Sequence, residues 1–291
     1  SKPFNYRIMA GIGDNTSKVT KYDNPNRTLT DPYEGQQLGE IWGYVVDGYF
    51  KTDEEARNYK VDQSFVNQMI NASALDNGLH AGDLKFVDLD GNNKIEQTTS
   101  ANDRKDMKVI GNSLPRYNYN FGISADWYGI DFSVLFQGIG KQNWYPGAET
   151  SMFWGPYSRP YASFIPSDFM SQVWSEENTN AYFPRPRGYV ALGSNRELAV
   201  VNTKYLQNLA YCRLKNLSIG YTLPDKWLSK IGFEKIRVYF SGENLLTFTK
   251  LHSDYIDPEQ ASASNSWKTS KSDANIYPWA KTYSFGVDIT F

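Results

Sequence analysis

The stretch TYSFGVDITF, Thr282 to Phe291, decides the fold class. Its side chains alternate with a period of two, which is typical of a strand with one apolar and one polar face. The apolar positions are Tyr283, Phe285, Val287, Ile289 and Phe291, and the positions between them are polar or glycine. Because chain ends usually fray and are polar, we expect neighbours to hold this strand along its full length.

The same alternation predicts five more strands, at residues 2–10, 116–127, 130–138, 211–223 and 235–243. The connections between the six strands alternate strictly between long and short, with lengths of about 105, 2, 70, 12 and 37 residues. Short periplasmic turns and long extracellular loops are typical of a transmembrane antiparallel β-barrel. The sequence therefore predicts an all-β barrel segment whose long loops carry short helices.

Six strands cannot enclose a roomy lumen, and a lipid-facing sheet must close on itself so that every backbone group is paired. We therefore expect residues 1–291 to be the C-terminal part of a larger polypeptide that supplies the other strands. The main alternative is a soluble extracellular β-sandwich, an adhesin or glycan-binding module, in which the apolar faces point inward. A weaker alternative is a secreted glycosidase, which requires two carboxylates about 5 to 9.5 Å apart.

Composition excludes several functions. The net charge of -2 and the absence of a Lys/Arg run argue against nucleic acid as a partner. The single cysteine, Cys212, excludes an internal disulfide and a cysteine-based zinc site. Only His80 and His252 could act as histidine bases, and neither lies near a nucleophile motif, so no enzymatic activity is expected. Aromatic residues make up 15% of the chain, which indicates that many contact a surface or partner.

Several longer stretches carry a family resemblance. They are GQQLGEIWGYVVDGYFKTDEEA (35–56), GDLKFVDLDGNNKI (82–95), VIGNSLPRYNYNFGISADWYGIDFSVLFQG (109–138), YCRLKNLSIGYTLP (211–224), KIRVYFSGENLLTFTKL (235–251) and DPE (257–259). In this order they resemble the C-terminal portion of the SusC/RagA family, the TonB-dependent outer-membrane transporters of Bacteroidetes-type bacteria. The resemblance spans nearly the whole chain.

The resemblance implies the last six strands of a twenty-two-stranded barrel in the bacterial outer membrane. It implies uptake of oligosaccharides or peptides under a SusD-like surface lipoprotein. It also implies an N-terminal plug and a TonB box, both absent from this sequence, so TonB would act through the remaining N-terminal part of the same transporter. Membrane lipid would contact the outside of the barrel.

The run DLDGNNKIE, Asp88 to Glu96, resembles the first half of a calcium loop. Oxygen side chains at every second position converge on one ion if the backbone turns sharply, and Asn93 accepts the left-handed conformation that such a turn needs. The predicted ligands of a structural calcium are Asp88, Asp90, Asn92 and Asp103, with Asp106 as another acid that could fold back. Thr99 stands where such loops carry a bidentate acid. The alternative is a turn held by Asx side chains.

The second long loop contains NWYPGAETSMFWGPYSRPY, residues 143–161. Rigid aromatic faces bind sugars and peptide side chains, so the predicted ligand-binding residues are Trp144, Tyr145, Trp154 and Tyr157. The alternative is that these aromatic residues pack the loops together or against a partner. Trp267 and Trp279 in the last loop have the same two interpretations.

Two short helices are expected in the long loops. Thr52-Asp-Glu-Glu55 predicts a capped helix from Thr52 to about Met69, and Ser167 predicts another to about Trp174. Both would serve as scaffolding or as a docking surface.

Overall fold

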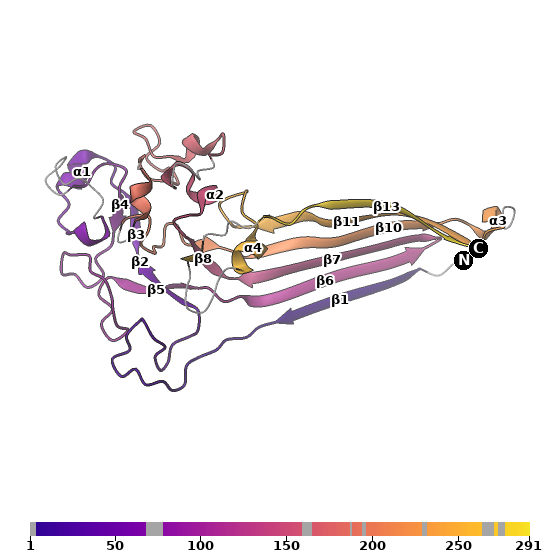
Figure 1. Ribbon diagram of the computed structural model, residues 1–291, viewed down its shortest axis with the longest axis horizontal. Coiled ribbons are helices and arrows are strands. Elements are labelled where there is room, and N and C mark those ends of the chain that lie inside the picture. The colour runs from indigo at the N-terminus through magenta and orange to yellow at the C-terminus, as the bar shows by residue number, and fades with distance from the viewer. Residues whose placement is uncertain are drawn as a thin grey trace.

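The computed structural model describes residues 4–67, 78–158, 165–186, 188–193, 196–228, 232–263, 271–272 and 277–291. Its main feature is an antiparallel sheet of six long strands that lie side by side in chain order (Figure 1). The strands are β1 (Asn5–Gly13), β6 (Arg116–Trp127), β7 (Ile130–Lys141), β10 (Tyr211–Thr222), β11 (Lys235–Thr249) and β13 (Thr282–Thr290). These are the six strands that the alternating pattern predicts, with β7 and β11 extending further into the loops.

The short and long connections lie at opposite ends of the sheet, as expected (Figure 1). One end holds the turn between β6 and β7 and the connection that carries α3 (Asp225–Leu228). Tyr128 and Gly129 form that turn with φ of 49° and 87°, the positive values that a two-residue hairpin turn matching the strand twist requires. The long connections, residues 14–115, 142–210 and 250–281, gather at the other end. We call them the loop assembly.

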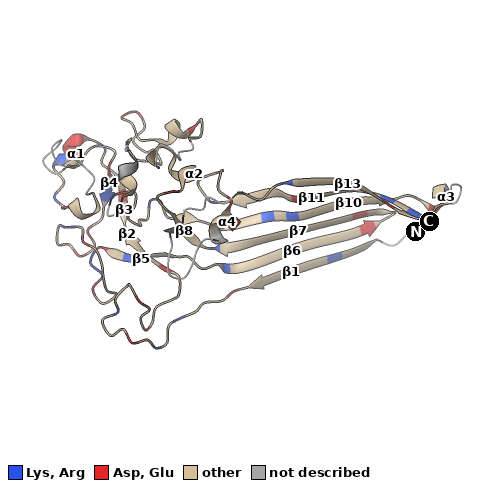
Figure 2. Ribbon diagram, in the orientation of Figure 1, with Lys and Arg blue, Asp and Glu red and all other residues tan. Residues whose placement is uncertain are grey.

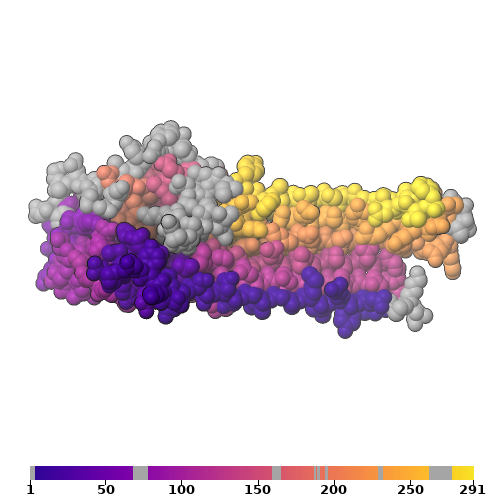
Figure 3. All heavy atoms as spheres, turned by 60° about the horizontal axis from the view of Figure 1, so that its bottom comes forward, coloured from indigo at the N-terminus to yellow at the C-terminus, as the bar shows by residue number. Residues whose placement is uncertain are grey.

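One face of the sheet is apolar and exposed, and we call it the outer face. It carries Phe285, 83% exposed, and Val287, 58% exposed, while Phe132 and Val134 are partly exposed. Within the described residues, no second sheet covers this face, and the hydrophobic core cluster lies in the loop assembly. The space-filling view shows the strands as one continuous wall from indigo β1 to yellow β13 (Figure 3). A β-sandwich with this face inside is therefore not what the described residues form.

The opposite, inner face carries the polar residues. Arg237 of β11 donates to Asp131 of β7 over 2.6 Å and to Asp288 of β13 over 3.2 Å. To reach β7 the guanidinium crosses β10 at Gly220, where a Cβ atom would lie 2.6 Å from the Arg237 Nε. Elsewhere charged residues are sparse on the strands and frequent in the loop assembly (Figure 2). Closure of this sheet into a twenty-two-stranded barrel stays a prediction.

A bulge in β10 marks the loop end of the sheet. Leu214 and Asn216 pair with the consecutive residues Phe136 and Leu135 of β7, so β10 carries one extra residue, Lys215, at that point. The partner strand β11 is also irregular there, and its Asn244 has φ of 54°. Beyond the bulge, β10 keeps its pairing with β7 and β11 for four more residues, as far as Tyr211.

In the described part of the loop assembly, all elements are short. Its three small sheets pair β2 with β5, β3 with β4, and β8 with β9 and β12. Their bounds are β2 (Glu40–Tyr44), β3 (Val46–Tyr49), β4 (Leu84–Phe86), β5 (Met107–Asn112), β8 (Asn143–Pro146), β9 (Gln207–Asn208) and β12 (Lys271–Ser272). The helical turns are α1 (Asp53–Arg57), η1 (Ser64–Val66), α2 (Ser151–Trp154), η2 (Gly155–Tyr157), η4 (Phe169–Gln172), η5 (Tyr189–Leu192) and α4 (Pro258–Ala263).

The two predicted helices are shorter than expected. Thr52 caps α1 as predicted, accepting from the Glu55 amide over 3.1 Å, but α1 ends at Arg57. The chain then forms a parallel bridge between Asp62 and Lys94, a tertiary contact that helix propensity does not reveal. The predicted end at Met69 lies outside the described residues. Of the helix predicted from Ser167 to about Trp174, only Phe169–Gln172 is helical. The Trp174 amide donates to the Phe183 carbonyl instead of continuing the helix.

Among the described residues, no helix has both the length and the apolar composition needed to cross a membrane.

Candidate functional site

The aromatic residues predicted to bind ligand form the core of the loop assembly. Trp144, Tyr145, Trp154 and Tyr157 are fully or almost fully buried. Their polar atoms also have partners within the core: the Trp154 indole donates to Gly147 over 2.9 Å and the Tyr157 hydroxyl to Pro184 over 2.7 Å. Side chains without exposed surface cannot contact a ligand in this conformation, which corrects the expectation. They pack the loops, as the alternative interpretation described.

Burial also changes the chemistry of this core. Desolvation raises the pKa of Tyr145 well above its ordinary value, so its hydroxyl stays protonated and donates to the Leu198 carbonyl over 2.8 Å. Phe153, Phe183 and Tyr205 surround Trp154 with ring centroids 4.8 to 6.4 Å away. Such edge-to-face pairs are favourable beyond their buried area. The loop assembly is thus a packed unit rather than a set of loose loops.

The predicted calcium loop forms a sharp turn held by its own side chains. Asp88 accepts from the amides of Gly91 and Asn93 over 2.7 and 2.6 Å, and Asn93 has φ of 63°. Asp106, which is buried, folds back and accepts from the amides of Leu89 and Glu96 over 2.9 and 2.7 Å. These are the Asx contacts of the alternative interpretation.

The carboxylates of Asp88, Asp90 and Asp106 nevertheless lie within 4.8 Å of one another. Burial, together with the nearby Asp90 and Asp88 charges, raises the pKa of Asp106. Asn92 accepts from the Lys94 amide instead, and Asp103 is not part of the cluster. Asp106 therefore takes the place predicted for Asp103, and binding of calcium stays a prediction.

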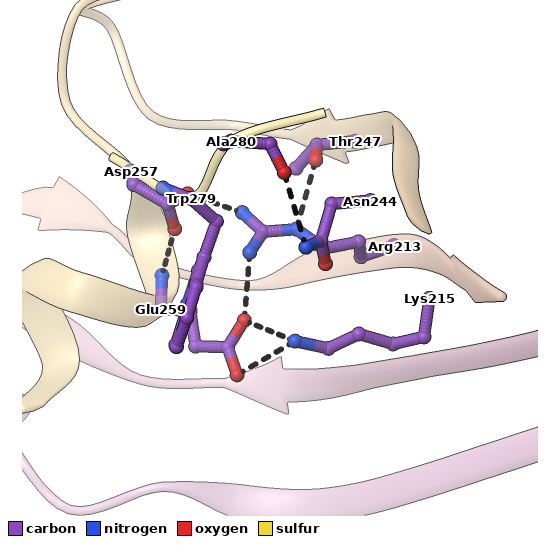
Figure 4. A network of polar contacts seen from close by, with 8 residues as sticks. All are labelled: Arg213, Lys215, Asn244, Thr247, Asp257, Glu259, Trp279 and Ala280. Atoms are coloured by element: carbon purple, nitrogen blue, oxygen red, sulfur yellow. Dashed lines mark hydrogen bonds and ion pairs between the residues drawn. The ribbon is translucent and has the colours of Figure 1, made fainter. Parts of the chain in front are cut away.

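A network of charges ties the last long loop to the inner face of the sheet (Figure 4). Arg213 of β10, 2% exposed, donates to Asp257 over 2.6 Å and to Glu259 over 2.7 Å. Lys215, the bulge residue, donates to the same Glu259 over 2.7 Å. Asp257 also caps α4 by accepting from the Glu259 amide over 2.9 Å. The motif DPE therefore docks the start of α4 on the sheet.

The same network reaches the far end of that loop. Trp279, which is 51% exposed, lies with its ring 5.5 Å from the Lys215 ammonium, and its amide donates to Asp257 over 3.4 Å. Asn244, at the irregular point of β11, donates to the Ala280 carbonyl over 3.3 Å (Figure 4). Both ends of the loop are thus held by the sheet. Trp267, the other tryptophan considered for this loop, lies outside the described residues.

An open cleft of about 900 Å³ lies between the first and second long loops. Lys51 and Asp53 line one wall, and Glu176 and Arg185 line the other. The Ala81 amide donates to Asp53 over 2.8 Å and, together with nearby His80 and Arg185, holds the pKa of Asp53 below its usual range despite partial desolvation. Within the described residues, this cleft presents charges of both signs to solvent.

Sequence reasoning missed both the docking network and the cleft. The signal for the network was present, because Arg213 and Lys215 interrupt a strand and DPE belongs to the motifs that carried the resemblance. The cleft had no signal, since its walls come from loop segments more than a hundred residues apart.

Known proteins with similar sequences are receptors. The TonB-dependent receptor P3 of Formosa agariphila is 29% identical over 264 residues, which cover 89% of this chain and 22% of that receptor. The TonB-dependent receptor P39 of the same organism is 26% identical over 283 residues, 89% of this chain and 25% of the receptor. The chain thus spans about a quarter of the length of these relatives. No family model matches the chain.

Solved structures share the fold. The RagAB peptide importer in the 'open-open' state superposes with a TM-score of 0.63 at 19% identity, over 100% of this chain and 27% of that chain. Its 'closed-closed' state gives 0.59 at 21% identity, over 100% and 28%. The relatives are receptors and transporters rather than enzymes, as expected from the sequence. The resemblance is therefore confirmed: the chain is similar in sequence to part of TonB-dependent receptors and in fold to part of the RagAB peptide importer.

Proposed function

We propose that this chain supplies the last six strands of an outer-membrane β-barrel that imports nutrients. The observation that carries the proposal is the outer face of the sheet, where Tyr6, Ile8, Phe285 and Val287 are all more than half exposed. Burying one large apolar side chain contributes about 1.5 to 3 kcal/mol, so an uncovered face of this size is unfavourable in water. In a bilayer the same face is solvated by hydrocarbon, and the polar inner face lines a wet lumen.

The edges of the sheet support the same proposal. β1 and β13 are the outermost strands of the described sheet, and in lipid their free backbone groups need partners. The remaining N-terminal part of the transporter would provide these strands, up to a total of twenty-two, and also the plug and the TonB box. Residues 1–291 then form the C-terminal part of the barrel.

The cargo and the partner are also proposed. The loop assembly lies at the end of the sheet opposite the short turns, which is the extracellular end in this orientation. A SusD-like surface lipoprotein would cover it, and oligosaccharides or peptides would enter between the two. The RagAB importer, whose structure is similar, is a peptide importer, which supports a cargo of that size.

The test is made on the whole transporter in its native membrane. We expect it to fractionate with the outer membrane, to need detergent for extraction, and to support uptake that stops when TonB is deleted. Material that stays monodisperse in plain buffer without detergent would reject the barrel. Uptake that continues unchanged without TonB would reject the transport mechanism while leaving the barrel intact.

A further inference from the structure

Each wall of the cleft between the first and second long loops carries charges of both signs. Lys51 and Asp53 flank Thr52 at the start of α1, and Glu176 and Arg185 lie on the second loop. Each wall therefore carries one cation and one anion. The volume of about 900 Å³ is sufficient for a ligand of several residues or sugar units.

Three of these four charged side chains have no ion-pair or hydrogen-bond partner among the described residues. In the described part of the chain, the side chains of Lys51, Glu176 and Arg185 make no ion pair or hydrogen bond. Two other arginines behave differently: the buried Arg213 contacts two carboxylates, and the partly buried Arg237 contacts two as well. Arg185 is itself partly buried, and it acts on Asp53 across the cleft through space without forming an ion pair with it.

The backbone around Arg185 is fixed, which leaves only the side chain to adapt. Its amide donates to the Gly82 carbonyl over 3.0 Å, and the Trp174 amide donates to Phe183 over 3.0 Å. Gly82 has φ of 82°, and a Cβ there would lie 2.6 Å from the Trp174 ring and 2.8 Å from the Arg185 Cβ. The Cβ end of the Arg185 side chain is thus packed closely against Gly82.

Trp174 adds a second observation at the same wall. It is only 8% exposed, and its indole nitrogen is buried with no hydrogen-bond partner among the described residues. An unmade hydrogen bond of a buried donor costs about 1 to 3 kcal/mol. The wall therefore carries a buried donor without an acceptor beside an arginine that forms no ion pair among the described residues.

We propose that Arg185 binds a carboxylate of the imported ligand in this cleft, an inference that rests on the proposed import function. A guanidinium offers two parallel N–H donors that match a carboxylate, and charge-assisted bonds of this kind are about twice as strong as neutral ones. Lys51 lies across the cleft and adds positive charge, while Glu176 and Asp53 accept from amine, amide or hydroxyl donors of the same ligand.

The carboxylate has two possible sources, an acidic peptide or an oligosaccharide that contains uronic acids. Neutral sugars fit this cleft less well, because Trp174 has too little exposed surface to stack on a sugar ring. The chemistry shared by the two acidic ligands is what the cleft recognises.

The experiment measures binding by the whole transporter with its partner lipoprotein in detergent. The probes are a fluorescent tetrapeptide ending in aspartate, the same peptide with both carboxyl groups amidated, a labelled oligogalacturonate, and its methyl-esterified form. We expect one of the two acids to bind and its neutral form to bind at least tenfold more weakly. Which acid binds identifies the source of the carboxylate.

The variants locate the effect. Arg185→Gln should weaken binding of the acid about tenfold or more. The affinity of Arg185→Lys for the acid should lie between those of the wild type and Arg185→Gln, because lysine keeps the charge and loses the paired donors. Arg104→Gln, which removes an exposed arginine outside the cleft, should leave affinity unchanged. Thermal unfolding of each variant checks that the loops remain folded.

Three results would overturn the inference: wild-type affinity in Arg185→Gln, equal binding of the acid and its neutral form, or no binding of either acid. If the transporter still imports a nutrient through TonB in any of these cases, only the carboxylate site is rejected and the import function stands. If the wild type imports nothing, the proposed function itself fails.

Discussion

The sheet and the loop assembly differ in the exposure of their apolar side chains. On the sheet, apolar side chains such as Phe285 are exposed on one face, whereas in the loop assembly Trp144 and Trp154 have no exposed surface at all. The sheet has regular hydrogen bonding and no core among the described residues, and the loop assembly has a core but very little regular structure.

In the proposed barrel, this difference reflects two solvents that act on one chain. A regular sheet satisfies its own backbone and leaves its apolar face for hydrocarbon, while the loops meet water and must bury their aromatic residues against one another. The docking network of Arg213, Asp257 and Glu259 joins the two regions. Changes in each region should therefore have different consequences.

The largest effect is expected in the core of the loop assembly. Trp154→Ala should lower the free energy of local unfolding there by about 3 to 5 kcal/mol, because it leaves a cavity among packed rings. Hydrogen exchange of loop amides in the whole transporter measures this. Trp279→Ala, at a half-exposed tryptophan, is the control and should cost much less. Equal effects would show that the loops have no real core.

The second largest effect is expected when the docking network is broken. Arg213→Met leaves the buried Asp257 without its cation and leaves Glu259 paired with Lys215 alone, which costs about 3 kcal/mol or more. We expect faster exchange and proteolysis in residues 250–281, with the strands unaffected. The triple variant with Asp257→Asn and Glu259→Gln should recover part of the loss. Unchanged protection in Arg213→Met would mean that the network does not hold the loop.

A charge on the outer face tests which solvent it meets. Phe285→Lys should destabilise the transporter in a bilayer by about 2 to 4 kcal/mol, because lysine cannot be solvated in hydrocarbon. Ser284→Lys places the same charge on the inner face and should cost little. Refolding into lipid vesicles gives both values. If Ser284→Lys cost more than Phe285→Lys, hydrocarbon would contact the inner face and not the outer face.

The smallest effect is a pH dependence within the loop assembly. His252 stacks on Tyr182 at 3.4 Å between ring centroids, and desolvation lowers its pKa, more than nearby Asp254 raises it, with Lys204 adding to the lowering. As pH falls through the ordinary value of 6.5, the unfolded chain therefore binds more protons than the folded chain. The free energy of unfolding of the loop assembly consequently decreases as pH falls through this range. Local exchange at pH 5 and 7.5 measures the loss, and His252→Gln should reduce it.

The sequence was sufficient to predict the strands but not the contents of the loops. Alternation is a local property, so residues 116–127 or 282–290 report their own structure. The exposure of Tyr145 depends on which other loop segments cover it, and no local pattern contains that information. The same reason explains why Asp106 rather than Asp103 joins Asp88 and Asp90, and why α1 stops at Arg57.

The extra residue in β10 has a practical consequence for mapping accessibility by cysteine labelling. Cys212 and Leu214 share the side of Ile219, whereas Arg213 shares the side of Ser218, so odd and even numbers exchange sides at Lys215. A labelling scan that assumes one parity for the whole strand would assign the residues on one side of the bulge, 211–214 or 216–222, to the wrong compartment. A water-soluble thiol reagent should give a pattern that inverts at this residue.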